Sequence, residues 1–115
     1  MAIHFMTSDP KRLLAEFDAR IAQKEAKGQI TTWLKASDGR YTHLAEAWQN
    51  KAWLKPKIQS DGLTFNIIKP PESNIKNMVY AYYHGHLIET FLNHFDSQFV
   101  DAIASALAEA DDIVG

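Results

Sequence analysis

Apolar and polar positions along the chain follow two periods, one typical of helices and one typical of strands. After Asp9 and Pro10, apolar side chains recur every three or four residues as far as Ile21, which is the spacing of an amphipathic helix. Asp accepts hydrogen bonds at a helix N-terminus, and Pro fits the first turn because it has no N–H group to leave unpaired. Gly28 can adopt the positive φ that ends many helices. The pattern predicts a helix over residues 10–27.

The middle of the chain alternates with period two or is rich in β-branched and aromatic residues, both of which indicate strands. The segments that fit strands are residues 30–35, 41–43, 52–58 and 63–69. Ser60-Asp61-Gly62, between the last two, has the turn chemistry of a hairpin. Pro56 has no N–H group for the ladder, so its strand is expected at a sheet edge or a bulge. Residues 44–50 fit either a short helix or an irregular connection.

The stretch from Met78 to Phe99 contains the next change of period. A strand is predicted over residues 78–84, with Val79, Ala81 and Tyr83 on one side and Met78, Tyr80, Tyr82 and His84 on the other. Gly85 is interpreted as a break. From Leu87 onward the apolar gaps of three and four predict a closing helix over residues 86–109. The alternative is a hairpin at His84-Gly85-His86 followed by a strand over residues 88–94, with Asp96-Ser97 capping a shorter helix.

These elements define the expected fold. Its class is α+β, a two-layer sandwich in which an antiparallel sheet of four to five strands carries the N-terminal and C-terminal helices on one face. The sequence contains no internal repeat and no linker. A single domain over residues 1–115 is therefore expected.

Composition excludes several classes of site. The chain has no cysteine, which rules out disulfides, thiolate nucleophiles and zinc-cysteine centres. The net charge of −2 does not suit a protein that coats nucleic acid. The first residues lack the basic and apolar regions of a secretory signal, and no apolar run is long enough to cross a membrane. The expected location is cytoplasmic, without membrane contact.

Charge is distributed unevenly along the chain. Residues 29–76 hold seven basic and four acidic side chains, whereas residues 77–115 hold six acidic ones and no basic ones. One interpretation is that carboxylates solvate the outer face of the closing helix. The other is that an acidic helix and a lysine-bearing sheet form complementary surfaces, either between subunits or for a charged partner.

One cluster has residue types suited to catalysis. His84 and His86 flank Gly85, and Glu89 and His94 follow them. An imidazole can act as acid or base near neutral pH, so His84, His86 and Glu89 are the catalytic candidates. The spacing matches no established metal motif, so neither a metal nor another cofactor is assigned. The structural alternative is a half-buried imidazole that hydrogen-bonds to the backbone.

Aromatic side chains suggest binding surfaces. The candidates for ligand or partner contact are Tyr80, Tyr82, His84, His86 and Trp53. The three tryptophans and the lysines around residues 51–57 also have the composition of single-strand binders, in which rings stack on bases. Tryptophans in a small domain are otherwise core residues, and no RNA-binding motif accompanies these.

Three functions follow, in order of preference. The first is a non-enzymatic binding module of the adaptor, chaperone or immunity type, which acts through an aromatic-rich sheet face and an acidic C-terminal helix. Its partner is expected to be another protein or a second copy of the chain, as in a homodimer. The second is a small-ligand-binding protein or enzyme with a pocket at the strand-to-helix corner formed by residues 82–89. The third is a weak binder of single-stranded nucleic acid.

Overall fold

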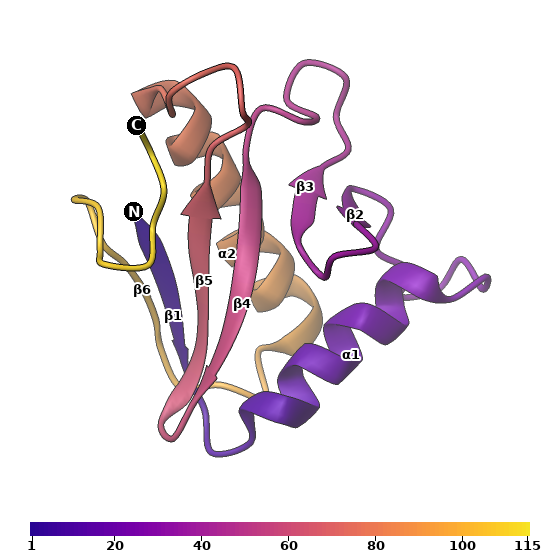
Figure 1. Cartoon of the computed structure of the whole chain (residues 1–115). Helices are drawn as coiled ribbons and strands as arrows, with labels where there is room; N and C mark the ends of the chain where they lie inside the picture. The colour runs from indigo at the N-terminus through magenta and orange to yellow at the C-terminus, as the bar shows by residue number, and fades with distance from the viewer.

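A six-stranded antiparallel sheet carries two helices in the computed structural model, which describes residues 1–115 (Figure 1). The elements are β1 (Ala2–Met6), α1 (Pro10–Ala22), β2 (Trp33–Lys35), β3 (Tyr41–His43), β4 (Trp53–Gln59), β5 (Gly62–Ile68), α2 (Asn77–Phe95) and β6 (Ala102–Ala104). The strand order is β2-β3-β4-β5-β1-β6, so the first strand of the chain is inserted between the fifth and the last. Neither helix has the combination of length and apolar content that crossing a bilayer requires.

Both helices pack on the same face of the sheet. The register pairs Phe5 of β1 with Leu63 of β5, so their side chains share a face with Phe65 two residues on. The Phe65 ring lies 6.1 Å from that of Phe17 on α1 and 5.7 Å from that of Phe91 on α2. In Figure 1, α2 passes behind β4 and β5. The buried core therefore lies between this sheet face and the two helices.

The predicted first helix is confirmed, although it is shorter than expected. Helix α1 begins at Pro10, and the side chain of Asp9 accepts a hydrogen bond from the Arg12 N–H at 3.2 Å. It ends at Ala22 because Gln23 has an extended backbone. Gly28 has a φ of 77° and lies in the turn that follows, rather than at the helix end.

The central hairpin is also confirmed. Strands β4 and β5 pair along their full lengths from Trp53 opposite Ile68 to Gln59 opposite Gly62. Strand β3 pairs with β4 only through Tyr41 and Leu54, so the outer edge of β4 is unpaired at Pro56. Pro56 therefore occupies a local sheet edge, as its missing N–H group predicts.

The predicted strand over residues 78–84 is wrong, and the predicted helix over residues 86–109 is confirmed only as far as Phe95. Residues 78–84 are helical, Gly85 lies inside α2, and the helix ends at Phe95 rather than at residue 109. The alternative strand over residues 88–94 is wrong as well. The buried positions of α2 begin at Val79 and continue through Tyr83 and Leu87 at four-residue spacing. The same residues alternate locally with polar ones, and this hid the helical period.

The α+β class and the antiparallel sheet are confirmed, but the sheet has six strands rather than four or five. Strands β1 and β6 are absent from the sequence prediction, and they pair with each other along one edge. Helix α2 is not the C-terminal element, because β6 and a further segment follow it. We call that segment, residues 105–115, the tail.

Candidate functional site

The catalytic candidate His84 is a buried residue on the core side of α2. Its Nδ1 lies 2.7 Å from the carbonyl oxygen of Tyr80, and its Nε2 has no hydrogen-bond partner. Burial lowers the pKa of His84, and the contact with the Tyr80 carbonyl only partly opposes this. His84 is therefore a neutral core imidazole near pH 7, and it points away from His86 on the opposite side of the helix.

The structure brings His86 and Glu89 together with Thr32, which the sequence analysis did not identify. The Nδ1 atom of His86 lies 3.1 Å from Glu89 Oε1, and its Nε2 lies 2.7 Å from Thr32 Oγ1. An ionised carboxylate only accepts hydrogen bonds, so Nδ1 carries the proton. In the neutral imidazole Nε2 is then the acceptor, and the Thr32 hydroxyl donates to it. Thr32 is 54 residues away in sequence, so no local pattern predicts this contact.

Aromatic stacking fixes the orientation of the His86 ring. It lies 5.1 Å from the Trp33 ring and 4.4 Å from the His43 ring, in stacked geometry with both. The Trp33 indole N–H donates to Thr90 at 3.0 Å, which holds the indole in place. Burial lowers the pKa of His43, and the neighbouring His86 lowers it further. The Trp33 and His43 rings also lie 5.5 Å from each other, so the three rings form one cluster, and His86 is held by this cluster and by its two hydrogen-bond partners.

Two clefts border His86 and Glu89. One has a volume of about 460 Å³ and is also lined by Ala81, Tyr82 and Gly85. The other has a volume of about 240 Å³, and Thr32 is among the residues that line it. No three His, Asp or Glu side chains are grouped closely enough to hold a metal ion. The arrangement can transfer a proton from a hydroxyl to an imidazole at the edge of a cleft.

The outer side of α2 is exposed and largely apolar. We call it the α2 face, and it consists of Met78, Ala81, Tyr82, Gly85, Glu89 and Leu92. Met78, Tyr82 and Leu92 are 66%, 54% and 52% exposed. The ring of Trp48 stacks on Tyr82 at 4.3 Å and extends the apolar area beyond the helix. A Cβ atom built at Gly85 meets no other atom within 4 Å.

The other aromatic candidates do not join this surface. Tyr80 is half-buried and packs edge-on against His84 at 5.5 Å. Trp53 is half-buried on β4, and Trp33 is a core residue. The expected aromatic sheet face is therefore wrong, because Tyr80 and Tyr82 belong to a helix and point to different sides of it.

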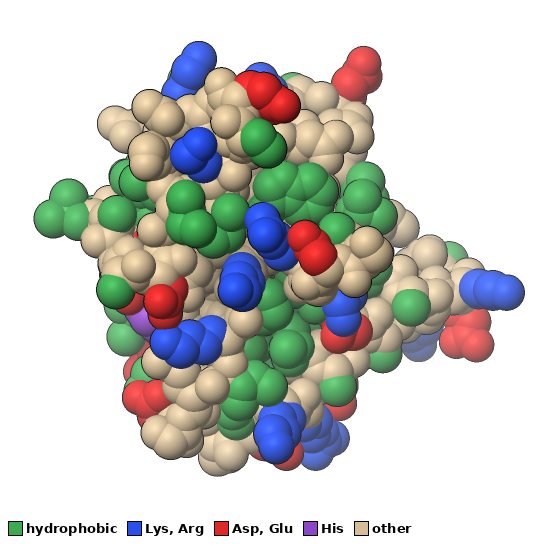
Figure 2. All heavy atoms as spheres, viewed as in Figure 1, with side chains coloured by type: hydrophobic (Ala, Val, Ile, Leu, Met, Phe, Trp, Pro, Cys, Tyr) green, Lys and Arg blue, Asp and Glu red, His purple; other side chains and the backbone are tan.

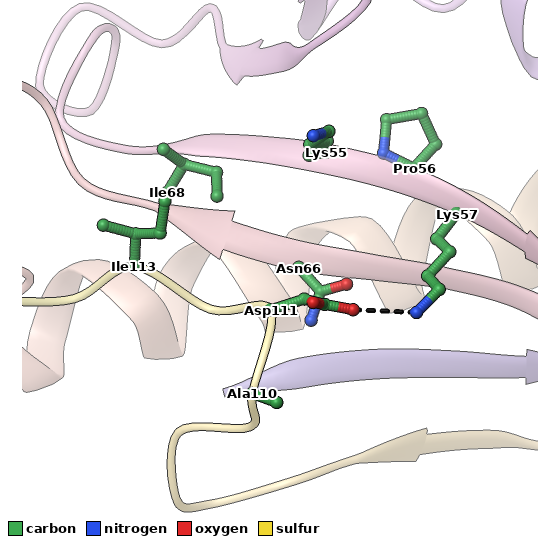
Figure 3. A pocket seen from close by; sticks show the side chains of 8 residues that line it. All are labelled: Lys55, Pro56, Lys57, Asn66, Ile68, Ala110, Asp111 and Ile113. Carbon is green, nitrogen blue, oxygen red and sulfur yellow. Dashed lines mark hydrogen bonds and ion pairs between the residues drawn. The ribbon is translucent and has the colours of Figure 1, made fainter.

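The sheet face opposite the helices is polar and is partly covered by the tail. Figure 2 shows basic side chains over this part of the surface, with apolar side chains between them, and the basic residues of β4 itself are Lys55 and Lys57. A pocket of about 490 Å³ lies between β4 and the tail (Figure 3). At its rim, Lys57 pairs with Asp111 at 2.8 Å. The sequence analysis did not predict this pocket, because it depends on where the tail docks.

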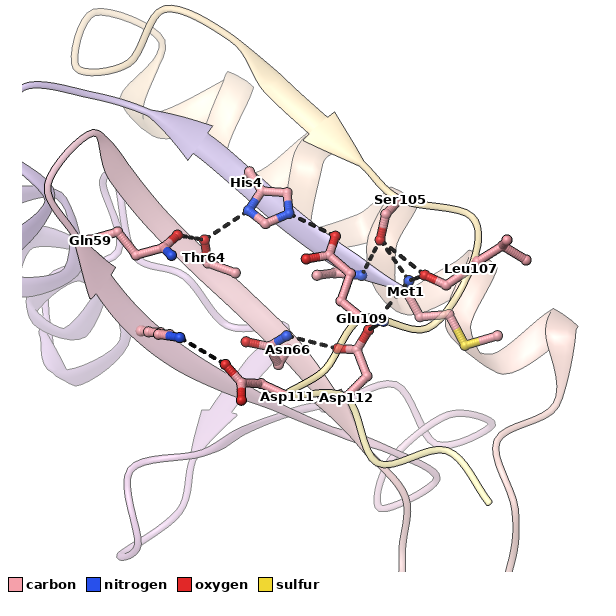
Figure 4. Close-up of polar contacts among 12 residues, drawn as sticks. Met1, His4, Gln59, Thr64, Asn66, Ser105, Leu107, Glu109, Asp111 and Asp112 are labelled. Carbon is pink, nitrogen blue, oxygen red and sulfur yellow. Dashed lines mark hydrogen bonds and ion pairs between the residues drawn. The ribbon is translucent and has the colours of Figure 1, made fainter.

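Asp112 holds the tail to the sheet (Figure 4). Its Oδ1 accepts from the Asn66 side chain at 2.9 Å and from the Ile67 N–H at 3.0 Å, and its Oδ2 accepts from the Glu109 N–H at 2.8 Å. Burial raises the pKa of Asp112, but these hydrogen bonds together outweigh it and hold the pKa below the ordinary value. His4 donates to the Glu109 carboxylate at 2.9 Å and adds a second attachment.

The acidic closing helix expected from the charge distribution is wrong. Glu89 is the only acidic residue within α2, and the other five follow the helix. Three of these five residues hold the tail in place. Asp111 binds Lys57, Glu109 binds His4, and Asp112 binds Asn66 and the backbone N–H of Glu109. Much of this negative charge therefore has an internal structural role.

These features form three surfaces. The first is the α2 face. The second consists of the two clefts that border His86 and Glu89, which we call the His86 cleft, and the third is the pocket between β4 and the tail, which we call the tail pocket. The α2 face and the His86 cleft meet at Tyr82, Gly85 and Glu89. Comparison with protein-family models, with curated proteins and with solved structures finds no match to this chain.

Proposed function

We propose that the chain is a protein-binding module whose contact surface is the α2 face. The observation that carries the proposal is the exposure of Met78, Tyr82 and Leu92 along one side of a regular helix. Scattered exposed apolar residues are ordinary on a protein surface, but several on one side of a helix are typical of an interface. Tyr and Met are also among the residues enriched at protein interfaces.

Gly85 supports the same proposal. A glycine inside a helix costs about 1 kcal/mol relative to alanine. The fold does not require this glycine, because a Cβ atom there meets nothing and its φ is not positive. The missing side chain instead leaves a depression in the α2 face, the cleft of about 460 Å³, into which side chains of a partner helix fit.

Photo-cross-linking tests this function. A benzophenone amino acid is placed at Tyr82, and at Leu107 as the control, because Leu107 is also exposed but lies on the tail. We expect cross-linked protein adducts in cells from position 82 only, and we expect Gly85→Arg to remove them, since a long charged side chain blocks the depression. Equal adduct yields from the two positions, or yields unaffected by Gly85→Arg, would contradict the proposal.

A second candidate function is acyl transfer at the His86 cleft, and the hydrogen-bonded chain from Thr32 through His86 to Glu89 favours it. In this chain Thr32 is the hydroxyl nucleophile, His86 is the imidazole base, and Glu89 is the carboxylate that orients the imidazole. Thr32 Oγ1 attacks the carbonyl carbon of an ester while Nε2 takes the hydroxyl proton. That proton passes to the departing alkoxide, leaving acyl-Thr32, which water then hydrolyses through the same imidazole.

Hydrolysis of p-nitrophenyl acetate tests this candidate. We expect His86→Ala and Thr32→Val each to lower the rate at least about 100-fold, since each removes a participant in proton transfer or attack. His4→Ala is the matched control, because His4 also lies between a threonine hydroxyl and a carboxylate, those of Thr64 and Glu109, but Thr64 is buried and its hydroxyl donates to Gln59. Mass spectrometry should detect one acetyl group on Thr32. A rate that falls equally in the His4 variant would exclude this reaction.

A further inference from the structure

The tail pocket has an aliphatic end and a polar end. In Figure 3, Ile68 and Ile113 lie beside each other at one end, and the ion pair of Lys57 with Asp111 lies at the other. Ile113 is fixed in this position by its backbone, which forms a parallel bridge with Ile68 and accepts a hydrogen bond from the Lys69 N–H at 2.7 Å. The aliphatic end is therefore a defined wall of the pocket.

Two acceptor oxygens of the pocket have no partner within the chain. Asn66 is only 4% exposed, and its amide nitrogen donates to the Asp112 carboxylate at 2.9 Å. A carboxylate accepts hydrogen bonds and donates none, so this contact fixes which way the amide faces and leaves its Oδ1 without a donor. Asp111 binds Lys57 through Oδ2 alone, and its Oδ1 is free. Both free acceptors belong to residues that line the pocket.

Lys55 supplies a cation without a counter-ion. It lies opposite Asn66 in the register of β4 and β5, and it is on the same sheet face as Lys57, two residues further along β4. Lys57 is paired with Asp111, whereas no carboxylate of the chain pairs with Lys55. The pocket thus presents one unpaired ammonium group, two unpaired acceptors and an aliphatic wall.

We infer that the tail pocket binds a free aliphatic α-amino acid. The carboxylate of the ligand pairs with the Lys55 ammonium group. Its own ammonium group donates to the free oxygens of Asn66 and Asp111. Its side chain packs on Ile68 and Ile113. The volume of about 490 Å³ is within the range of small-molecule sites, which combine apolar walls with a few placed polar groups.

The combination of groups selects this ligand class over simpler occupants. A water molecule satisfies an acceptor but gains nothing from the aliphatic wall. A fatty acid matches Lys55 and the wall, but it leaves the oxygens of Asn66 and Asp111 without donors. An alkylamine matches the oxygens and the wall, but it leaves Lys55 unpaired. Only a ligand with both charges and an apolar side chain uses every group, and unpaired polar groups in a bound complex weaken binding.

The tail pocket is independent of the proposed protein-binding surface. It is on the sheet face opposite the helices, whereas the α2 face is the outer side of a helix. Loss of ligand binding therefore leaves the cross-linking expected at Tyr82 unchanged, and loss of cross-linking leaves ligand binding unchanged.

Isothermal titration calorimetry with L-leucine tests the inference. We expect a single site with a dissociation constant below about 1 mM. L-leucinamide lacks the carboxylate, 4-methylpentanoate lacks the amine and glycine lacks the side chain, and each should bind at least about tenfold more weakly. The absence of heat with leucine at about 10 mM, or equal affinity for leucine and either of its two analogues, would overturn the inference.

Substitution of the unpaired cation tests the carboxylate contact. Lys55→Met keeps an unbranched side chain but removes the charge, so it should weaken leucine binding at least about tenfold. Lys51→Met is the matched control, because Lys51 is exposed and lies outside the pocket. It should leave the dissociation constant within about twofold. Equal effects of the two substitutions would mean that Lys55 does not bind the ligand.

Asp111→Asn separates binding from folding. The variant replaces a charge-assisted contact to the ligand ammonium with a neutral one, so leucine should bind about tenfold more weakly. Its melting temperature should stay within about 4 °C of the wild type, since the ion pair with Lys57 is exposed. Undiminished binding by this variant would contradict the assigned role of Asp111.

Amide NMR spectra recorded during the leucine titration locate the site. We expect the largest shifts at Lys55, Asn66, Asp111 and Ile113, which come from three separate segments that meet only at the tail pocket. Shifts confined to the α2 face or to the His86 cleft would overturn the inference, because the ligand would then occupy a different surface.

Discussion

Replacing Phe91 with alanine is expected to lower the free energy of unfolding by about 4 kcal/mol, because the substitution removes a ring from the centre of the core. The Phe91 ring stacks on Phe5 at 4.2 Å and lies 5.0 Å from Phe17 and 5.7 Å from Phe65. It thus connects α2 with β1, β5 and α1. Truncation leaves a cavity within this cluster, since rigid neighbouring rings cannot collapse to fill it.

Urea unfolding followed by tryptophan fluorescence measures this effect. The control is Leu92→Ala, the adjacent residue of the same helix, which is 52% exposed. We expect the control to change the free energy of unfolding by less than about 0.5 kcal/mol, because it removes no core contact. Similar losses for the two variants would mean that α2 does not present Phe91 to the core.

Asp112→Asn is expected to destabilise the protein by about 3 kcal/mol at neutral pH. The Asp112 side chain has no exposed surface, and its carboxylate accepts from Asn66, from the Ile67 N–H and from the Glu109 N–H. The asparagine amide has an NH₂ group in place of one carboxylate oxygen. That NH₂ group would face one of the three N–H donors, which would then have no acceptor. Asp111→Asn is the matched control, because Asp111 forms an exposed ion pair that contributes less than about 1 kcal/mol.

The contribution of Asp112 to the free energy of unfolding is expected to depend on pH. The folded pKa of Asp112 is below its ordinary value of 3.8, so the unfolded chain takes up a proton first as the pH falls. The stabilisation by this carboxylate is complete above the ordinary pKa and is lost as the pH falls through the folded pKa. The difference between wild type and Asp112→Asn should therefore narrow below about pH 4. Unfolding curves from pH 7 to pH 2 measure it, and a constant difference would show that Asp112 titrates normally.

The sequence was sufficient to predict an element where the residues that stabilise it lie close together in the chain. The cap at Asp9 and Pro10 defines the start of α1, and the turn at residues 60–62 defines the β4–β5 hairpin. In both cases the stabilising contacts are within a few residues of each other. The edge position of Pro56 was predictable for the same reason, because a missing N–H group is a property of the residue itself.

The α2 segment shows where local signals fail. Val79, Ala81 and Tyr83 alternate as in a strand, whereas Val79, Tyr83 and Leu87 follow a helical period, and the sequence contains both patterns. Gly85 favoured the interpretation as a break. Packing against the core decides between the strand and the helix. The helix buries Val79, Tyr83 and Leu87 on one side, and the free energy gained by this burial outweighs the cost of one glycine. The partner-binding hypothesis consequently moves from a sheet face to a helix face, with Tyr82 as the residue common to both.

By itself, the sequence determined the α+β class, the antiparallel hairpin, the first helix and the candidates His86 and Glu89, because each depends on residue type and short spacing. Only the tertiary structure decided that β1 is inserted between β5 and β6, that Thr32 contacts His86, and that Asp112 binds the tail to the sheet. These contacts join segments 45 or more residues apart. Their stability comes from buried area and paired polar groups that exist only after the chain has folded.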